Sequence, residues 1–340
     1  MGRRWFLCLG LCLVTWRLHS AFAGALQLGA ASRGARTVRR VRERKVNRAP
    51  RQGRARSGKA SGQTDPRVIT KRISQLASAS EVLAVVKQEQ LNPKLNLICI
   101  SAAWAKIAKM PRSLAVGLDD VRHDPFFPAF VLLTEDWAKK AGAEPKVYAR
   151  AVASTLWAVS KLYAFVPSRL ASLQKQLSIA VPKTAEYMDA QAIANIIWAS
   201  AKLSDSGDDS LLALLPALSD RVQEVKQDMN AQAVANIIWA SAKLSDSGDD
   251  SLLALLPALS DRVQEVKQDM NAQAVANIIW ASAKLSDSGD DSLLALLPAL
   301  CGRVQEVKQD MNAQAVANII WASAKLSDSG DDSLLALLPA

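Results

Sequence analysis

Five tryptophans follow one another at a constant spacing of 41 residues, and this period restricts the fold of the chain more than any other feature. They are Trp157, Trp198, Trp239, Trp280 and Trp321. The segment 229–269 recurs as 270–310 with only two residues changed. A fixed period of this size is typical of a solenoid, in which each unit packs mainly against its neighbours.

The period also indicates how the chain is organised. Residues 65–145 are expected to form diverged N-terminal helical repeats, with a looser copy of the motif around Trp104. Ala340 corresponds to Ala258, which lies inside a complete unit, so we expect the chain to be a C-terminally truncated fragment. The regular helical repeats are expected over 146–340, as the units 146–187, 188–228, 229–269, 270–310 and a partial unit 311–340.

Each unit is predicted to contain a first helix followed by a tight turn. In the second of the near-identical units this helix is expected from about Ala231 to Ser245, with Asn230 as its N-cap. Asp189 is an equally good cap in the unit before. Gly248 can adopt the left-handed conformation that commonly ends a helix, so the first helix should stop just before it.

A second helix is predicted from about Ser251 to Gln268, capped by Asp249 or Asp250 and kinked at Pro257. No part of the unit alternates with a period of two, so strands are not expected. The predicted fold class is therefore all-α, an α-solenoid of ~41-residue helix-turn-helix repeats.

The second helix carries its apolar residues on one stripe at helical spacing. These residues are Leu252, Leu255, Leu256, Leu259, Val263 and Val266, with Asp261, Gln264, Glu265 and Gln268 opposite. One repeat alone has nothing against which to bury such a stripe, so neighbouring repeats must stack.

The first helix carries a polar stripe that includes the repeated tryptophan. In one unit Gln232, Asn236, Trp239 and Lys243 fall within about 60° of one another around the helix axis. Amides can hydrogen-bond base edges, lysines can contact phosphates and indoles can stack on bases, so this stripe is a candidate site for single-stranded RNA. The full set of candidate RNA-binding residues is Gln191, Asn195, Trp198, Lys202, Gln232, Asn236, Trp239, Lys243, Gln273, Asn277, Trp280, Lys284, Gln314, Asn318, Trp321 and Lys325.

Structural alternatives stay open for each residue type in this stripe. Trp239 is also a candidate for packing between repeats, and Asn236 for a buried hydrogen bond to the backbone of the adjacent repeat. Lys243 could simply be solvated. The acids of the turn 246–250 are expected to lie at the edge of the repeat, away from the stripe.

The charge of the chain is unevenly distributed. The net charge is +10, but residues 1–23 contribute +3 and residues 24–60 contribute +11, which leaves −4 for the remainder. The unit 229–269 alone carries −3. Because phosphate neutralisation dominates nucleic-acid affinity, three possibilities remain. The basic side chains concentrate on one groove, the diverged N-terminal repeats bind the RNA, or the array binds protein.

The N-terminus has the layout of a targeting leader. Arg3 and Arg4 precede an apolar run, and Ala21-Phe22-Ala23 offers a cleavage site, so residues 1–23 are predicted to be a signal peptide. Residues 24–64 are rich in Arg and Ser and almost free of acids, so we expect a disordered transit-like segment.

The two leader segments together resemble the bipartite leader of algae with complex plastids, such as dinoflagellates. Plastid import is thus the expected localisation, with the mitochondrion as the alternative. A signal anchor and a basic RNA-binding arm remain further interpretations of the leader, and no membrane span is expected in the mature chain.

Enzymatic chemistry finds little support in the composition. The chain has two histidines, of which His123 is expected in a loop at a helix start, and Cys99 and Cys301 are expected to be buried free thiols. Neither a metal site nor a cofactor is predicted. Capping explains the Asp249-Asp250 pair better than catalysis or calcium binding does. We therefore expect a protein that is not an enzyme.

The first helix also resembles a known repeat. Asn236, Trp239, Ala240, Ala242, Lys243 and Leu244 match the core Asn-x-x-Trp-Ala-x-(Ala/Ser)-Lys-Leu of the octotricopeptide repeat. Residues 69–110 are similar to N-terminal helices of FAST-kinase-like and RNA-editing-substrate-binding-complex repeat proteins. The 41-residue unit is slightly longer than is usual for that repeat and is acidic, and residues 1–340 show no resemblance to an endonuclease-like RAP domain.

The resemblance implies an α-solenoid that binds single-stranded organellar RNA. It would act in RNA processing, editing, stability or translation, and other RNA-processing proteins are the further partners to expect. The alternative from another functional class is a protein–protein interaction scaffold built on the same α-solenoid.

Overall fold

The computed structural model describes residues 65–110, 121–328, 330–332 and 334. The chain divides into two compact units, 1–59 and 60–340, and the described residues all belong to the second. The predicted signal peptide and transit-like segment therefore lie outside the described residues, as does Ala340.

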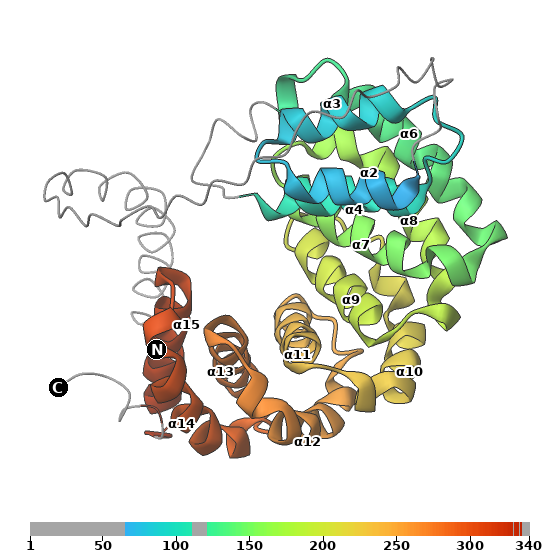
Figure 1. Ribbon diagram of the computed structural model, residues 1–340. Helices are drawn as coiled ribbons and strands as arrows, with labels where there is room; N and C mark the ends of the chain where they lie inside the picture. The colour runs from blue at the N-terminus through green and yellow to red at the C-terminus, as the bar shows by residue number, and fades with distance from the viewer. Residues whose placement is uncertain (1–64, 111–120, 329, 333, 335–340) are drawn as a thin grey trace, which may run out of the picture. The chain divides into compact units, whose positions relative to one another are not determined.

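Every regular element among the described residues is helical, which confirms the predicted all-α class (Figure 1). The α-helices are α2 Pro66–Gln75, α3 Ala79–Glu89, α4 Leu97–Lys109, α6 Phe127–Lys140, α7 Pro145–Tyr163, α8 Pro167–Thr184, α9 Ala190–Ser204, α10 Leu215–Val225, α11 Ala231–Asp246, α12 Leu256–Val266, α13 Ala272–Asp287, α14 Leu297–Val307 and α15 Ala313–Asp328.

The helices of the compact unit 60–340 stack in the order of the sequence. Helices α4, α7, α9, α11, α13 and α15 pack each against the next and form one layer. Helices α10, α12 and α14 lie behind α9, α11 and α13 as a second layer, on the outer side of the stack in Figure 1. This arrangement confirms the expected stacking of neighbours in an α-solenoid.

The first helix of each repeat begins and ends as its sequence predicts. The side chain of Asn230 accepts a hydrogen bond from the backbone N–H of Ala233, and Asp189 does the same for Ala192 one repeat earlier. At the other end of α11, Gly248 has a φ of +90°. Its N–H donates to the carbonyl of Ser245, so α11 ends in a Schellman motif, which needs the left-handed residue.

The second helix differs from the prediction. A 3₁₀ turn, Leu253–Leu255, precedes α12, and a second one, Lys267–Asp269, follows it. Pro257 therefore lies in the first turn of α12 and does not kink a longer helix. The reason is that Pro lacks an N–H, and the first turn of a helix is the place where no N–H is needed.

The predicted acidic cap of the second helix is also wrong. Helix α12 has no side-chain cap at its N-terminus. Asp249 instead accepts a hydrogen bond from the backbone N–H of Ser251, 3.0 Å away. Asp250 accepts one from the Ser245 hydroxyl, at 2.6 Å. Both carboxylates thus hold the turn between α11 and the 3₁₀ helix, which occupies the residues where α12 was expected to begin.

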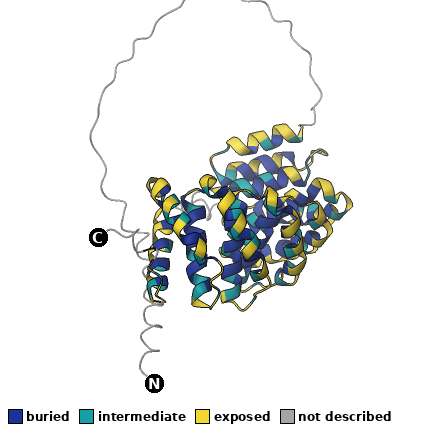
Figure 2. Cartoon of the chain, turned by 90° about the horizontal axis from the view of Figure 1, so that it is seen from below, coloured by how far each residue is buried: buried dark blue, intermediate teal, exposed yellow. Residues whose placement is uncertain are grey.

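The predicted apolar stripe of the second helix is confirmed. All six of its residues are at most 7% exposed, and the residues predicted opposite are exposed. Figure 2 shows the same division along the stack, with buried residues where helices meet and exposed residues on the outward faces. Burial of this stripe between neighbouring helices is what couples one repeat to the next.

An arginine in each second helix ties it to the start of the first helix of the same repeat. Nε of Arg262 donates to the backbone carbonyl of Met229 at 2.9 Å, and the guanidinium also pairs with Glu265. The equivalent Arg303 binds the Met270 carbonyl at 3.0 Å. The carbonyl involved is that of the residue just before the N-cap of the first helix, so this bond links the two helices of one repeat.

Trp104 does not continue the tryptophan period into the N-terminal helices. Its side chain is 0% exposed, stacks on Phe130 with ring centroids 4.6 Å apart, and donates from Nε1 to the Thr134 hydroxyl at 2.9 Å. A looser copy of the motif was predicted around Trp104, and its ring is buried in the core instead of joining the row of the other tryptophans. It is Ala105 that faces the same side as the other tryptophans.

Candidate functional site: a tryptophan-lined groove

The repeated tryptophans form a continuous row along the layer of first helices. Successive ring centroids, from Trp157 to Trp321, lie 6.2, 5.9, 6.4 and 6.0 Å apart, with interplanar angles of 30–43°. Each ring is half-buried, because one side packs on its neighbours and the other remains accessible. The two roles predicted for this residue, packing between repeats and an accessible aromatic surface, are thus geometrically compatible.

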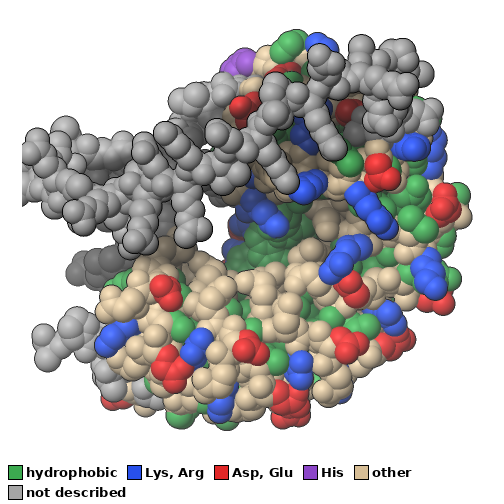
Figure 3. All heavy atoms as spheres, in the orientation of Figure 1, with side chains coloured by type: hydrophobic (Ala, Val, Ile, Leu, Met, Phe, Trp, Pro, Cys, Tyr) green, Lys and Arg blue, Asp and Glu red, His purple; other side chains and the backbone are tan. Residues whose placement is uncertain are grey.

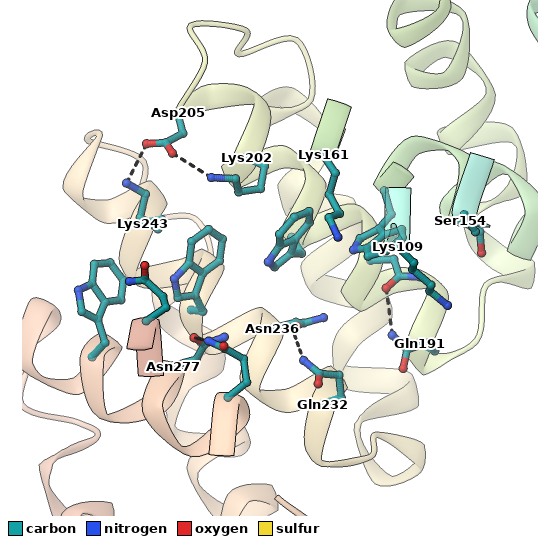
Figure 4. A pocket seen from close by; sticks show the side chains of 18 of the residues that line it. Lys109, Ser154, Lys161, Gln191, Lys202, Asp205, Gln232, Asn236, Lys243 and Asn277 are labelled. Carbon is teal, nitrogen blue, oxygen red and sulfur yellow. Dashed lines mark hydrogen bonds and ion pairs between the residues drawn. The ribbon is translucent and has the colours of Figure 1, made fainter. Parts of the chain in front are cut away.

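The row of rings forms the wall of a groove with a volume of about 980 Å³. Figure 3 shows this side of the molecule as a hollow in which hydrophobic atoms are visible, with lysine or arginine side chains beside them. Most of the predicted site residues meet in this groove (Figure 4). Lys284, Trp321 and Lys325 are the predicted site residues that do not line it.

The groove carries one pair of amide side chains per repeat. Nε2 of Gln232 donates to Oδ1 of Asn236 at 2.7 Å within α11 (Figure 4). The equivalent distances are 3.0 Å in α9, 2.7 Å in α13 and 2.8 Å in α15. The alternative predicted for Asn236, a hydrogen bond to the backbone of the adjacent repeat, is not observed, since its partner is the side chain one turn earlier.

The lysines of the stripe are paired with acids across the repeat boundary. Nζ of Lys243 lies 2.9 Å from Oδ1 of Asp205, which also pairs with Lys202 at 3.1 Å. Burial raises the pKa of Asp205, but the hydrogen bonds from Lys243 and Lys202 outweigh it, so that the net pKa lies below its ordinary value. The same pairing recurs as Lys284 with Asp246 at 2.6 Å.

These pairs correct the expectation that the first acid of the turn lies away from the stripe. Asp246 is the last residue of α11, and its carboxylate reaches Lys284 of the next repeat, as that of Asp205 reaches Lys243. The lysines over α11–α15 are consequently not isolated cations.

The α4–α9 end of the groove is more positively charged than the α11–α15 end. Lys109 and Lys161 both lie over the ring of Trp157, with Nζ at 6.0 and 4.7 Å from its centroid. At the position equivalent to Asp205, 41 residues earlier, the chain has Ala164. The residues that line the groove include four lysines and one aspartate, which gives them a net charge of +3. That positive charge is concentrated around α4, α7 and α9.

Five residues of α4 and α7 line this end of the groove and were not among the predicted site residues. They are Ala105, Lys109, Ser154, Trp157 and Lys161. Ser154 and Lys161 lie 41 residues before Asn195 and Lys202, so the period already contained their signal. Lys109 had no such signal, because the helix that carries it lies outside the regular spacing.

The structure offers few groups for metal binding or nucleophilic chemistry. Across residues 65–110 and 121–328, no three metal-binding side chains cluster. Cys99 is a buried free thiol as predicted, whereas Cys301 is half-buried and not fully buried. Burial raises the pKa of both thiols, which disfavours the reactive thiolate.

His123 is exposed and lies at the end of a short helical segment, immediately before the turn that leads into α6. His123 was expected in a loop at the start of a helix, whereas the structure places it at the end of a helical segment, one turn before α6 begins. None of the described helices is long and apolar enough to cross a membrane.

The fold and the groove together define an α-helical repeat protein whose first helices form an aromatic and polar surface. No model of a known protein family matches the chain, and no curated protein matches it.

Proposed function

We propose that this protein binds single-stranded RNA along the groove. The observation that carries the proposal is the unbroken row of half-buried indoles, accompanied in α9, α11, α13 and α15 by an amide pair that lines the same groove. Aromatic rings bind unpaired bases by stacking at about 1–3 kcal/mol per base, whereas bases inside a duplex offer them no free face.

The charge distribution supports phosphate contacts at one end of the groove. Lys109 and Lys161 lie over the Trp157 ring at the α4–α9 end, where the groove lining carries a net positive charge. Lys202 follows on α9 and is paired with Asp205. Over α11–α15 the lysine charges are compensated by aspartates, so binding there rests on stacking and on the amides. The uneven charge of the chain left three possibilities open. The proposal adopts the one in which the diverged N-terminal helices make the electrostatic contacts with RNA.

The biological role follows from the leader and the resemblance. The signal peptide and transit-like segment predicted in the sequence favour import into a plastid, with the mitochondrion as the alternative. We propose that the protein has no enzymatic activity, and that it acts in RNA processing, editing, stability or translation through the RNA that it holds. Fluorescence microscopy of the tagged full chain, with plastid and mitochondrial markers, tests the destination.

A lysine-to-glutamate triple variant tests RNA binding. In the full chain, Lys109, Lys161 and Lys202 are changed to Glu, and affinity for single-stranded RNA is measured over a range of salt concentrations. Lys202 is paired with Asp205, so the change removes the two phosphate contacts of Lys109 and Lys161 and is expected to reduce the steepness of log K against log salt by about 1.4 for a single strand. Circular dichroism checks that helicity persists.

The matched control changes Lys226, Lys267 and Lys308 to Glu. These lysines lie in the 3₁₀ turns after the second helices and do not line the groove, but the change in net charge is the same. We expect the control to retain most of its affinity. Equal losses in both triple variants would contradict a specific role for the groove.

The paired lysines also favour a second candidate function. Because Lys284 and Lys325 are neutralised by Asp246 and Asp287, the α13–α15 end is suited to a neutral partner such as a protein segment. A protein-interaction scaffold predicts that the groove triple variant and the unmodified chain show the same weak affinity for RNA.

A further inference from the structure

Four successive repeats carry the same four side chains on one face of the first helix, and the Gln and Asn of all four line the groove. Helices α9, α11, α13 and α15 each carry Gln, Asn, Trp and Lys at equivalent positions. The hydrogen bond between the Gln and Asn side chains is present in all four, and the centroids of consecutive rings stay 5.9–6.4 Å apart. The repetition therefore extends from the sequence to the geometry of the groove.

Helical-repeat proteins that read RNA do so with two or three side chains of one repeat for one base. Discrimination between different bases at successive positions requires that these side chains differ from repeat to repeat. In this chain they are the same, so each repeat favours the same base. We propose that the groove over α9–α15 selects a tract of one repeated nucleotide, and this inference rests on the proposed function.

The amide pairs have the hydrogen-bonding groups that such selection needs. Oδ1 of Asn236 is occupied by Gln232, which leaves Nδ2 of Asn236 as a donor and Oε1 of Gln232 as an acceptor. Figure 4 shows the Asn236 nitrogen on the groove side. If the two amides are both flipped, one donor and one acceptor still remain. All four repeats carry the same donor and acceptor atoms, but the Gln oxygen already accepts a hydrogen bond from the N-cap Asn of the next repeat in α9 and α13, at 3.5 and 3.4 Å. This oxygen has a second lone pair, so it can still accept from a base.

The uniformity does not extend to α7, the first helix of the unit 146–187. Helix α7 carries Ser154 and Arg150 where α9 has Asn195 and Gln191, although Trp157 keeps the ring in place. Arg150 is drawn away by an ion pair with Asp189, 3.4 Å apart. The uniform tract is therefore predicted to lie over α9–α15, and the nucleotide over α7 is read by different groups.

Because the repeats are uniform, the affinity for a homopolymer should increase with the length of the RNA strand. A tract longer than the groove can bind in several registers that differ by one nucleotide and have the same energy. Each additional register adds to the observed association constant. A strand of mixed sequence has no such equivalent registers, so its affinity should not increase in the same way once the groove is full.

The test uses the full chain and fluorescently labelled RNA strands of one length. The strands are oligo(A), oligo(U), oligo(C) and a mixed strand in which no two neighbouring bases are the same. We expect one homopolymer to bind at least about tenfold more tightly than the mixed strand, which corresponds to about 1.4 kcal/mol. Equal affinity for all strands, or a preference for the mixed strand, would overturn the inference. Absence of binding to any strand would instead contradict the proposed function.

A single variant asks whether the amide pair reads the base. Gln232→Ala breaks the uniformity in α11, and Gln264→Ala, on the exposed face of α12, serves as the matched control. The Gln232 variant should lose about tenfold in affinity for the preferred homopolymer and much less for the mixed strand. If the variant weakens all strands by the same factor, the amides do not select the base. Circular dichroism distinguishes either result from misfolding.

Discussion

Nζ of Lys284 in α13 lies 2.6 Å from Oδ1 of Asp246, the last residue of α11. The same relationship links Lys243 to Asp205 at 2.9 Å and Lys325 to Asp287 at 3.1 Å. Each ion pair crosses the boundary between two repeats at the edge of the groove. Half-exposed pairs of this kind contribute little to stability, about 0–1 kcal/mol, so their main effect is on the charge available to a ligand.

Release of a paired lysine is expected to strengthen RNA binding. In Asp205→Asn the carboxylate that pairs with Lys202 and Lys243 is removed, and both ammonium groups become available to phosphates. We expect higher affinity for single-stranded RNA and a salt slope that is steeper by about 1, which filter binding at several salt concentrations measures.

Asp261→Asn is the matched control for this variant. It removes the same charge from an exposed position on α12, opposite the apolar stripe and outside the groove. A gain in affinity as large as that of Asp205→Asn would mean that only the net charge matters and that the ion pairs have no special role.

Acid should weaken the contribution of Asp205 to stability. Burial raises the pKa of this carboxyl, but hydrogen bonds from Lys243 and Lys202 hold it below the ordinary value of 3.8. A depressed pKa in the folded state stabilises the fold above the ordinary pKa, and this stabilisation is lost as the pH falls through the folded-state value. Urea unfolding of the unmodified chain and of Asp205→Asn should therefore differ at neutral pH and converge in acid. A difference that persists unchanged at low pH would argue against this assignment.

Removal of the arginine that ties the two helices of a repeat should destabilise the fold. Arg262→Ala eliminates the bond to the Met229 carbonyl, a hydrogen bond to a charged donor in a half-buried setting. We expect a loss of about 1.5–3 kcal/mol in the free energy of unfolding, measured by urea denaturation. Lys267→Ala, which removes a charge without a comparable backbone bond, should change stability far less.

Gly302 offers a stabilising substitution. It lies inside α14, and a Cβ added there meets no atom within 4 Å. Gly302→Ala should increase the free energy of unfolding by about 0.5–1 kcal/mol, because Ala loses less backbone freedom than Gly in a helix. Gly289→Ala is the contrasting control, since Gly289 also has open space but a φ of +93°, where an L side chain is strained. Thermal unfolding should show opposite shifts for the two variants.

Local features of the repeat were predictable because they depend on neighbours in the chain. The caps at Asn230 and Asp189, the left-handed Gly248 and the buried stripe of α12 were all predicted and are confirmed. The predicted kink at Pro257 was wrong. Whether Pro257 lies inside the helix or in its first turn depends on where α12 begins, and a 3₁₀ turn occupies the residues before it.

The sequence by itself determined the helical class, the stacking of repeats and the residues that share one face of each first helix. Periodicity and capping are properties of a few consecutive residues, so they can be read along the chain. Only the tertiary structure decided that Asp246 reaches Lys284, that Trp104 is buried while Ala105 faces the groove, and that the positive charge lies at the α4–α9 end. These relationships depend on the register and rotation between stacked helices, which the packing of residues far apart in the sequence sets.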